Sequence, residues 1–206
     1  MYTRCRNWIV RAWMAVLFSP RFTCRLLLDE RGAVGDIKMV YAAASTLTQT
    51  NLDGIASSAT WVAGWGSATI DNSSSLHQDY AIGASIMVES AGLAAGEIRM
   101  YLVAELNDSA YPDCLSAGTE GTEGTVTFTD TEIRDAVARL AARTATDTTA
   151  SRVYTLQCPS VKKVFGGTCP RKFFIVITQS TGAALESTGD PNQVYVKGVY
   201  YTVAQS

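Results

Sequence analysis

The sequence is poor in charged residues, in histidine and in long apolar runs, and each shortage narrows what the chain can do. Only 17% of its 206 residues are charged, against about a quarter in a typical globular protein. Ser, Thr, Ala and Gly take their place, a composition typical of short strands joined by tight turns. No apolar run approaches the roughly 20 residues needed to cross a bilayer. The chain is therefore expected to form one domain, with an appendage at most, and no membrane span.

Metal and cofactor chemistry have little to draw on. The chain holds a single histidine, His77, and its five cysteines stand at positions 5, 24, 114, 158 and 169, with no C-x-x-C pair. No zinc site is predicted from such spacing. The odd count favours free thiols and assembly in the cytosol, with a Cys158–Cys169 bridge as the alternative because both residues flank one turn-like region. No phosphate-cradling loop is present either, so no metal or cofactor is expected.

Some residues still deserve a test as catalytic groups. His77, with Asp79 two residues later, is a candidate general base. However, the sequence has no G-x-S-x-G elbow that would supply a nucleophile. Paired carboxylates of the glycosidase type occur at Asp108 and Asp113 and at Glu120 and Glu123. All lie in segments rich in turn formers, which favours a surface histidine and solvated acids. The chain is predicted not to be an enzyme.

Charge divides the chain near residue 38. Residues 1–38 hold seven basic and three acidic side chains, a net charge of +4, which leaves −6 for residues 39–206. The acidic body argues against nucleic-acid binding, which needs a basic face. The basic segment fits three readings: an arm that docks on a neighbouring subunit, an amphipathic helix at a membrane surface, or an irregular extension outside the natural product. We favour the last, with translation starting at Met39 and a domain over 39–206.

From Ala42 onward the apolar residues mostly recur with a period of two, which predicts strands. The predicted strands are 80–88, 98–106, a strand beginning at 126, 172–180 as the most buried one, and 193–204 as the closing one. Strands 80–88 and 98–106 are expected to pair as an antiparallel hairpin. Asp130 is expected to cap a short helix, and 161–167 to form one helical turn ended by glycine. The fold class is all-β, a β-sandwich or jelly roll with one or two short helices.

Aromatic side chains are the remaining signal. The candidates are Trp61, Trp65, Tyr101, Tyr111, Tyr195, Tyr200 and Tyr201. They suit a sugar-binding face, a subunit interface or a sheet core, and the core is the simplest reading for most of them. Trp61, Trp65, Tyr111 and Tyr201 are predicted as candidate interface residues. On a regular strand Trp61 and Trp65 would face the same side, unless Gly64 and Gly66 create a bulge.

The stretch "SSATWVAGWGSATIDNSSSLHQDYAIGASIMV", followed by "EIRMYLVAELNDSAYPDC", resembles a family of small virion structural proteins of tailed bacteriophages. "TATDTTASRVYTL", "VFGGTCPRKFFIVITQSTGAAL" and "VYVKGVYYTV" are similar to the same family, so the resemblance covers about residues 40–204. It implies a β-sandwich or jelly-roll particle component, made in the host cytoplasm and placed on the capsid surface. Its partners would be the major capsid protein or other virion proteins and further copies of the chain, as a homotrimer.

Besides a hydrolase that would use His77 with the loop carboxylates, two other functions stay open from the residues. Within the same class, the chain would be a tail- or fibre-associated virion protein. In another class, it would be a lectin-like carbohydrate-binding module that uses the aromatic face.

Overall fold

The computed structural model describes residues 37–107, 110–189 and 191–203. The chain divides into two units, and the larger, Met39–Tyr201, contains the sandwich. The basic extension predicted over residues 1–38 falls almost wholly outside the described residues, as does Asp108. The domain boundary at residue 39 therefore stays a prediction.

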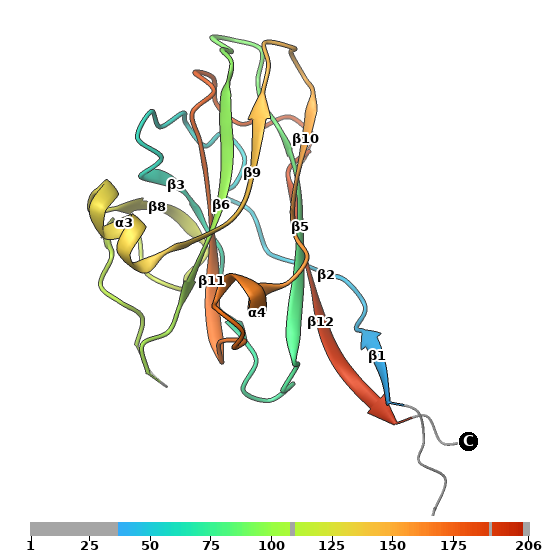
Figure 1. Ribbon diagram of the computed structural model, residues 1–206. Helices are drawn as coiled ribbons and strands as arrows, with labels where there is room; N and C mark the ends of the chain where they lie inside the picture. Colours follow the sequence, from blue (N-terminus) through green and yellow to red (C-terminus); the bar gives the residue numbers. More distant parts are fainter. Residues whose placement is uncertain (1–36, 108–109, 190, 204–206) are drawn as a thin grey trace, which may run out of the picture. The chain divides into compact units, whose positions relative to one another are not determined.

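Two antiparallel sheets form the sandwich, as predicted (Figure 1). The five-stranded sheet consists of β1 (Ile37–Tyr41), β2 (Ser45–Thr46), β5 (Asp79–Met87), β10 (Val153–Cys158) and β12 (Gln193–Val203). The seven-stranded sheet consists of β3 (Ala63–Gly66), β4 (Ile70–Asp71), β6 (Gly96–Ala104), β7 (Leu115–Ala117), β8 (Gly124–Phe128), β9 (Arg139–Thr146) and β11 (Lys172–Gln179). In the first sheet the order is β1-β12-β5-β10, and in the second it is β7-β8-β3-β11-β6-β9.

The main core lies between the two sheets and follows the period-two pattern. Ile82, Ile86 and Val194 from the five-stranded sheet pack in one cluster with residues such as Met100 and Ile175 from the seven-stranded sheet. Alternate residues of β5 are buried and half-exposed, as expected for a strand with one covered face. The hydrophobic pattern therefore fixes which side of each strand faces inward.

A second cluster covers the outer face of the seven-stranded sheet. Its buried members are Tyr101, Val103, Cys114, Val126, Phe128, Ala138, Phe174 and Val176. Half-buried residues of the helix α3 (Thr131–Val137), Ile133 and Val137, pack against it. This cover explains why β11 is buried along nearly its whole length on both faces, which confirms the prediction for 172–180.

The predicted hairpin of 80–88 with 98–106 is wrong. Both strands exist, but β5 pairs with β10 and β12 while β6 pairs with β9 and β11, so they lie in different sheets. The connection between them crosses the sandwich, and Val88 at its start bridges to Leu185. The physical reason lies in the side chains. β6 carries apolar residues on both faces, which suits the sheet covered on both sides, whereas β5 has one face of small residues.

Both short helices form where the cap at Asp130 and the glycine-terminated stretch 161–167 predict them. The Oδ1 atom of Asp130 accepts the backbone N–H of Ile133 at 2.6 Å and so caps α3. Ser160 caps α4 (Val161–Val164) through Lys163 N–H at 3.0 Å. Gly166 and Gly167 follow in positive-φ conformations that stop the turn.

Candidate functional site

The loop between β4 and β5 holds the histidine and is folded by a buried asparagine. Asn72 accepts the backbone N–H of His77 on Oδ1 at 2.7 Å and donates from Nδ2 to His77 O at 2.9 Å. The carbonyl of Asn72 also accepts the N–H of Leu76 at 3.0 Å. These bonds close the polar run into a compact turn, with Leu76 exposed at positive φ. The histidine therefore lies in a loop, as predicted, and hydrogen bonds within the loop fix its conformation.

His77 is held by its neighbours on three sides. Its Nδ1 atom lies 3.2 Å from the Tyr80 hydroxyl, which donates to Asn72 Oδ1 at 2.9 Å, so Nδ1 is the donor toward Tyr80. The two rings meet edge to face with centroids 5.2 Å apart, and the Tyr200 ring lies 6.0 Å away. Below the imidazole is Gly198, where any Cβ would overlap the ring. A glycine within a strand marks such a close approach.

The suggested pair of His77 with Asp79 does not form. Asp79 Oδ1 accepts the N–H of Tyr80 at 2.7 Å and the N–H of Lys162, in α4, at 2.8 Å. It therefore ties β5 to the helix, and the group on the His77 ring is a phenol. Burial raises the pKa of Tyr80 to about 12, with smaller contributions from Cys169 and Asp71. Such a phenol stays protonated at neutral pH and serves as a fixed hydrogen-bonding group.

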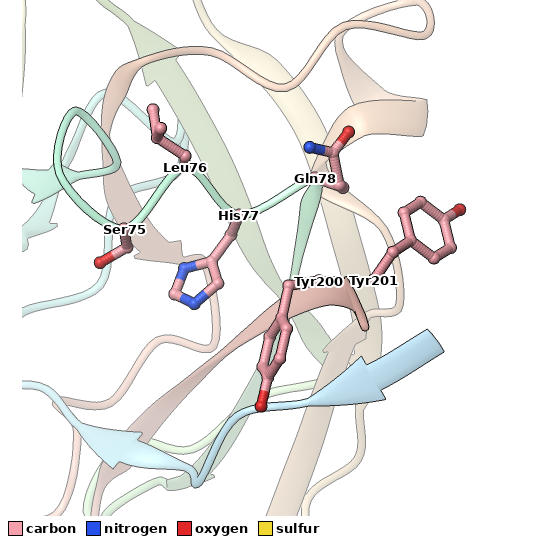
Figure 2. A pocket seen from close by; sticks show the side chains of 6 residues that line it. All are labelled: Ser75, Leu76, His77, Gln78, Tyr200 and Tyr201. Carbon is pink, nitrogen blue, oxygen red and sulfur yellow. The ribbon is translucent and has the colours of Figure 1, made fainter. Parts of the chain in front are cut away.

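An open hollow of about 540 Å³ lies beside this histidine. Its lining residues are Ser75, Leu76, His77, Gln78, Tyr200 and Tyr201 (Figure 2). Figure 2 shows His77 and Tyr200 side by side, with Gln78 and Tyr201 toward one side and Ser75 and Leu76 toward the other. None of the lining side chains is an acid, a lysine or an arginine. The hollow is thus aromatic and has no acidic, lysine or arginine side chain in its lining, and it is the candidate site of the sandwich.

The four candidate interface residues lie in four different environments. Trp65 is fully buried in the main core, so it has no exposed surface to offer a partner. Trp61 precedes β3 at positive φ, half-buried, with the Arg99 guanidinium 3.7 Å above its ring. Tyr111 is half-buried against Phe174 over the outer cluster. Tyr201 is 60% exposed, so it alone among the four offers most of its side chain to a partner.

The same-side arrangement of the two tryptophans was conditional on a regular strand, and that condition fails for Trp61. Trp61 lies before the start of β3, and its backbone φ is 53°, which is not a strand conformation. Gly64 and Gly66 do not create a bulge, because β3 pairs with β8 in continuous register. The glycines serve close packing instead.

The loop carboxylates turn out to be structural acceptors. Glu120 accepts the N–H groups of Cys114 and Leu115 at 3.4 and 3.3 Å. Glu123 accepts the indole N–H of Trp65 at 2.8 Å and both the backbone and side-chain N–H groups of Asn51. The interpretation of these two acids as merely solvated is therefore wrong. A buried indole N–H needs an acceptor, and a lone Trp followed by a distant Glu gives no sequence signal for it.

The hydrogen bonds of Glu123 make stability depend on pH. Burial alone would raise the pKa of Glu123, but the bonds from Trp65 and Asn51 outweigh it and hold the pKa below the usual 4.5. A lowered pKa stabilises the fold fully above the unfolded-state value, and this contribution is lost as pH falls through the folded-state value. Urea unfolding at about pH 6 and about pH 4 should thus show a smaller loss in Glu123→Gln than in the wild type. An equal loss in both proteins would contradict the assignment, and Glu132→Gln, at an exposed site, is the control.

The described residues were also compared with the requirements for a metal site, a disulfide bond and a membrane span. Within residues 37–107, 110–189 and 191–203, no group of three His, Cys, Asp or Glu side chains is arranged to hold a metal ion. Cys114, Cys158 and Cys169 are free thiols, so the alternative Cys158–Cys169 bridge is not formed. Burial raises the pKa of Cys114 to about 12, which keeps that thiol protonated. Among the described helices, none is long and apolar enough to span a bilayer.

His77, Tyr200 and Tyr201 were named as candidates from the sequence, but Asn72, Tyr80 and Gly198 were not predicted to position His77. Asn72 and Gly198 left a usable signal, since Asn in a D-N-S run is a turn former and Gly in a strand marks close approach. Tyr80 left none beyond its place in the alternation of β5. No protein-family model and no curated protein matches the chain.

Proposed function

We propose that the chain is a bacteriophage virion structural protein, a decoration (cement) protein that stabilises the head through subunit contacts. The resemblance over residues 40–204 motivates it, and the all-β sandwich is the fold that the resemblance implies. Its partners would be the major capsid protein and neighbouring copies of the chain. A homotrimer is the expected arrangement, because cement proteins usually work at symmetry axes.

Exposed apolar side chains on and beside β1, an edge strand among the described strands, carry the proposal. In the order of the described strands, β1 stands at one end of the five-stranded sheet and β10 at the other. Met39 and Tyr41, in β1, are 55% and 54% exposed, and Tyr201, in the neighbouring β12, is exposed as well. Large apolar groups gathered on a surface mark interaction sites, and an unpaired edge strand offers backbone groups to another chain. A protein that acts by contacting neighbours needs such a surface.

The outer face of the five-stranded sheet supports the same role. Ala81, Gly83 and Ser85 of β5 point outward, and a shallow hollow of about 380 Å³ lies over the first two. Side chains this small let another protein approach the sheet closely, at little cost in side-chain entropy. The hydrogen bonding of His77 and Asp79 favours a scaffold over a catalyst, because both groups are engaged in holding the loop and α4.

Mass spectrometry of purified particles, separated into heads and tails, tests the proposal. Peptides of this chain should appear in the head fraction, in a constant ratio to the major capsid protein. Recovery from the tail fraction alone would establish the tail- or fibre-associated alternative instead. Absence from both fractions would overturn the assignment to the virion.

A further inference from the structure

We propose that the hollow between residues 75–78 and the end of β12 binds a neutral saccharide of one or two rings. The inference goes beyond the virion role and does not depend on it. It starts from a hollow whose volume of about 540 Å³ lies within the range of about 300–1,000 Å³ typical of small-molecule sites.

Aromatic rings give the hollow its apolar part. Tyr200 and Tyr201 are 38% and 60% exposed, large fractions for tyrosine rings on a sheet. Leu76 adds a further exposed apolar group from the facing loop. The C–H face of a pyranose ring is flat and apolar, and it covers an aromatic ring with little loss of ligand hydration. Tyr200 beside His77 supplies such a platform (Figure 2).

Polar atoms around the rings match hydroxyl groups. Ser75 supplies a hydroxyl, Gln78 an amide and His77 the Nε2 atom. Within the described part of the chain, these groups and the Tyr200 hydroxyl have no protein hydrogen-bond partner. Each of these groups can accept a hydrogen bond and most can also donate one, as sugar hydroxyls do. Phosphate and carboxylate ligands are disfavoured, because the lining has no Lys or Arg.

The platform is rigid before any ligand arrives. Asn72 fixes the loop backbone on both sides of the His77 peptide, Tyr80 holds the Nδ1 atom, and Gly198 seats the ring. Preorganisation of this kind lowers the entropy lost on binding. The imidazole of His77, which lines the hollow, is thereby kept in a constant position, and this suits recognition of a hydroxyl group.

Titration of the full chain with glucose, galactose, N-acetylglucosamine and maltose, followed by ¹H–¹⁵N NMR, tests the site. At least one sugar should shift the resonances of residues 75–78 and 200–201, with a dissociation constant of about 1 mM. Tyr200→Ala should weaken binding about tenfold. Gln78→Leu, which leaves the strand intact, should weaken it similarly. Tyr195→Ala changes a tyrosine of the same strand that lines a different hollow, and it should bind as the wild type does.

Three results would overturn the saccharide site. The first is the absence of shifts with all four sugars. The second is equal binding by the wild type, Tyr200→Ala and Gln78→Leu. The third is movement of the same resonances on raising the protein concentration without sugar, which would assign the hollow to contacts between copies. Tyr201 lines this hollow and also lies among the exposed apolar residues near β1, so no variant at that position is used. A negative result for sugar binding therefore does not affect the interpretation of the particle experiment.

Discussion

Ile175→Ala should lower the free energy of unfolding by about 2–5 kcal/mol. Ile175 lies in the middle of β11, is fully buried, and contributes to the core between the two sheets. β11 has partners on both sides, with Leu102 of β6 opposite Ile175. The surrounding strands therefore have little freedom to collapse into the space left by the lost carbons. Chemical denaturation of the wild type and the variant measures the difference.

Leu140→Ala is the matched control for this substitution. It removes the same number of carbon atoms from a strand of the same sheet, but Leu140 is 46% exposed. Its loss should be well below that of Ile175→Ala. A loss below about 1 kcal/mol for Ile175→Ala would contradict the burial of Ile175 in the core between the two sheets.

Gly64→Ala should destabilise the sandwich by about 3 kcal/mol, at the upper end of the cost of an overpacked core. A Cβ at position 64 would overlap the carbonyl oxygen of Ile177 and lie 2.9 Å from Cγ2 of Thr178. The obstacle is the backbone of the neighbouring strand, so no side-chain rotation relieves it. β3 would have to separate from β11, and Trp65 would move with it. Thermal unfolding and the Trp65 indole N–H resonance both report this.

Gly83→Ala makes the same chemical change in a position of open space. Gly83 lies within β5, at ordinary φ, and an added Cβ there meets no atom within 4 Å. The variant should keep or slightly exceed wild-type stability, because alanine restricts the unfolded chain. Equal effects of the two substitutions would show that the cost at position 64 comes from glycine propensity and not from the approach of β11.

The inward faces of the strands were predictable because alternation is a local property. Ile98, Met100 and Leu102 share the core face of β6 as their spacing requires, and Val194 and Val196 do so in β12. The cap at Asp130 and the glycines after residue 165 placed the two short helices for the same reason, since these signals act within a few residues. The fold class followed from these local signals together.

Strand pairing was not predictable, because it depends on contacts between distant segments. The alternation of β5 and β6 fits a hairpin as well as it fits two sheets. The stretch 144–156 is likewise composed of strand-forming residues, with no break that its composition marks. Instead, Asp147 accepts the N–H of Thr149 at 2.9 Å and the Tyr154 hydroxyl at 2.8 Å, and this turn separates β9 from β10. The spacing of apolar residues in the sequence does not reveal hydrogen bonds of this kind.

The site was only partly visible in the sequence. His77 stood out as the single histidine. Its partners Asn72 and Tyr80 are near it in the sequence, but Gly198, in β12, is more than a hundred residues away. Trp65 was predicted as a candidate interface residue on a strand that Gly64 and Gly66 could bulge. Those glycines instead allow the close packing that buries it.

Binding of the purified chain to phage heads that lack it, measured by co-sedimentation, tests the central proposal most directly. The wild type should sediment with heads at a saturable ratio. The double variant Met39→Ser/Tyr41→Ser should lose binding while it keeps its fold, because it removes the exposed apolar groups of β1. Leu140→Ser, at another exposed apolar site, should bind as the wild type does. A folded wild-type chain that stays in the supernatant at every ratio of chain to heads would contradict the cement role.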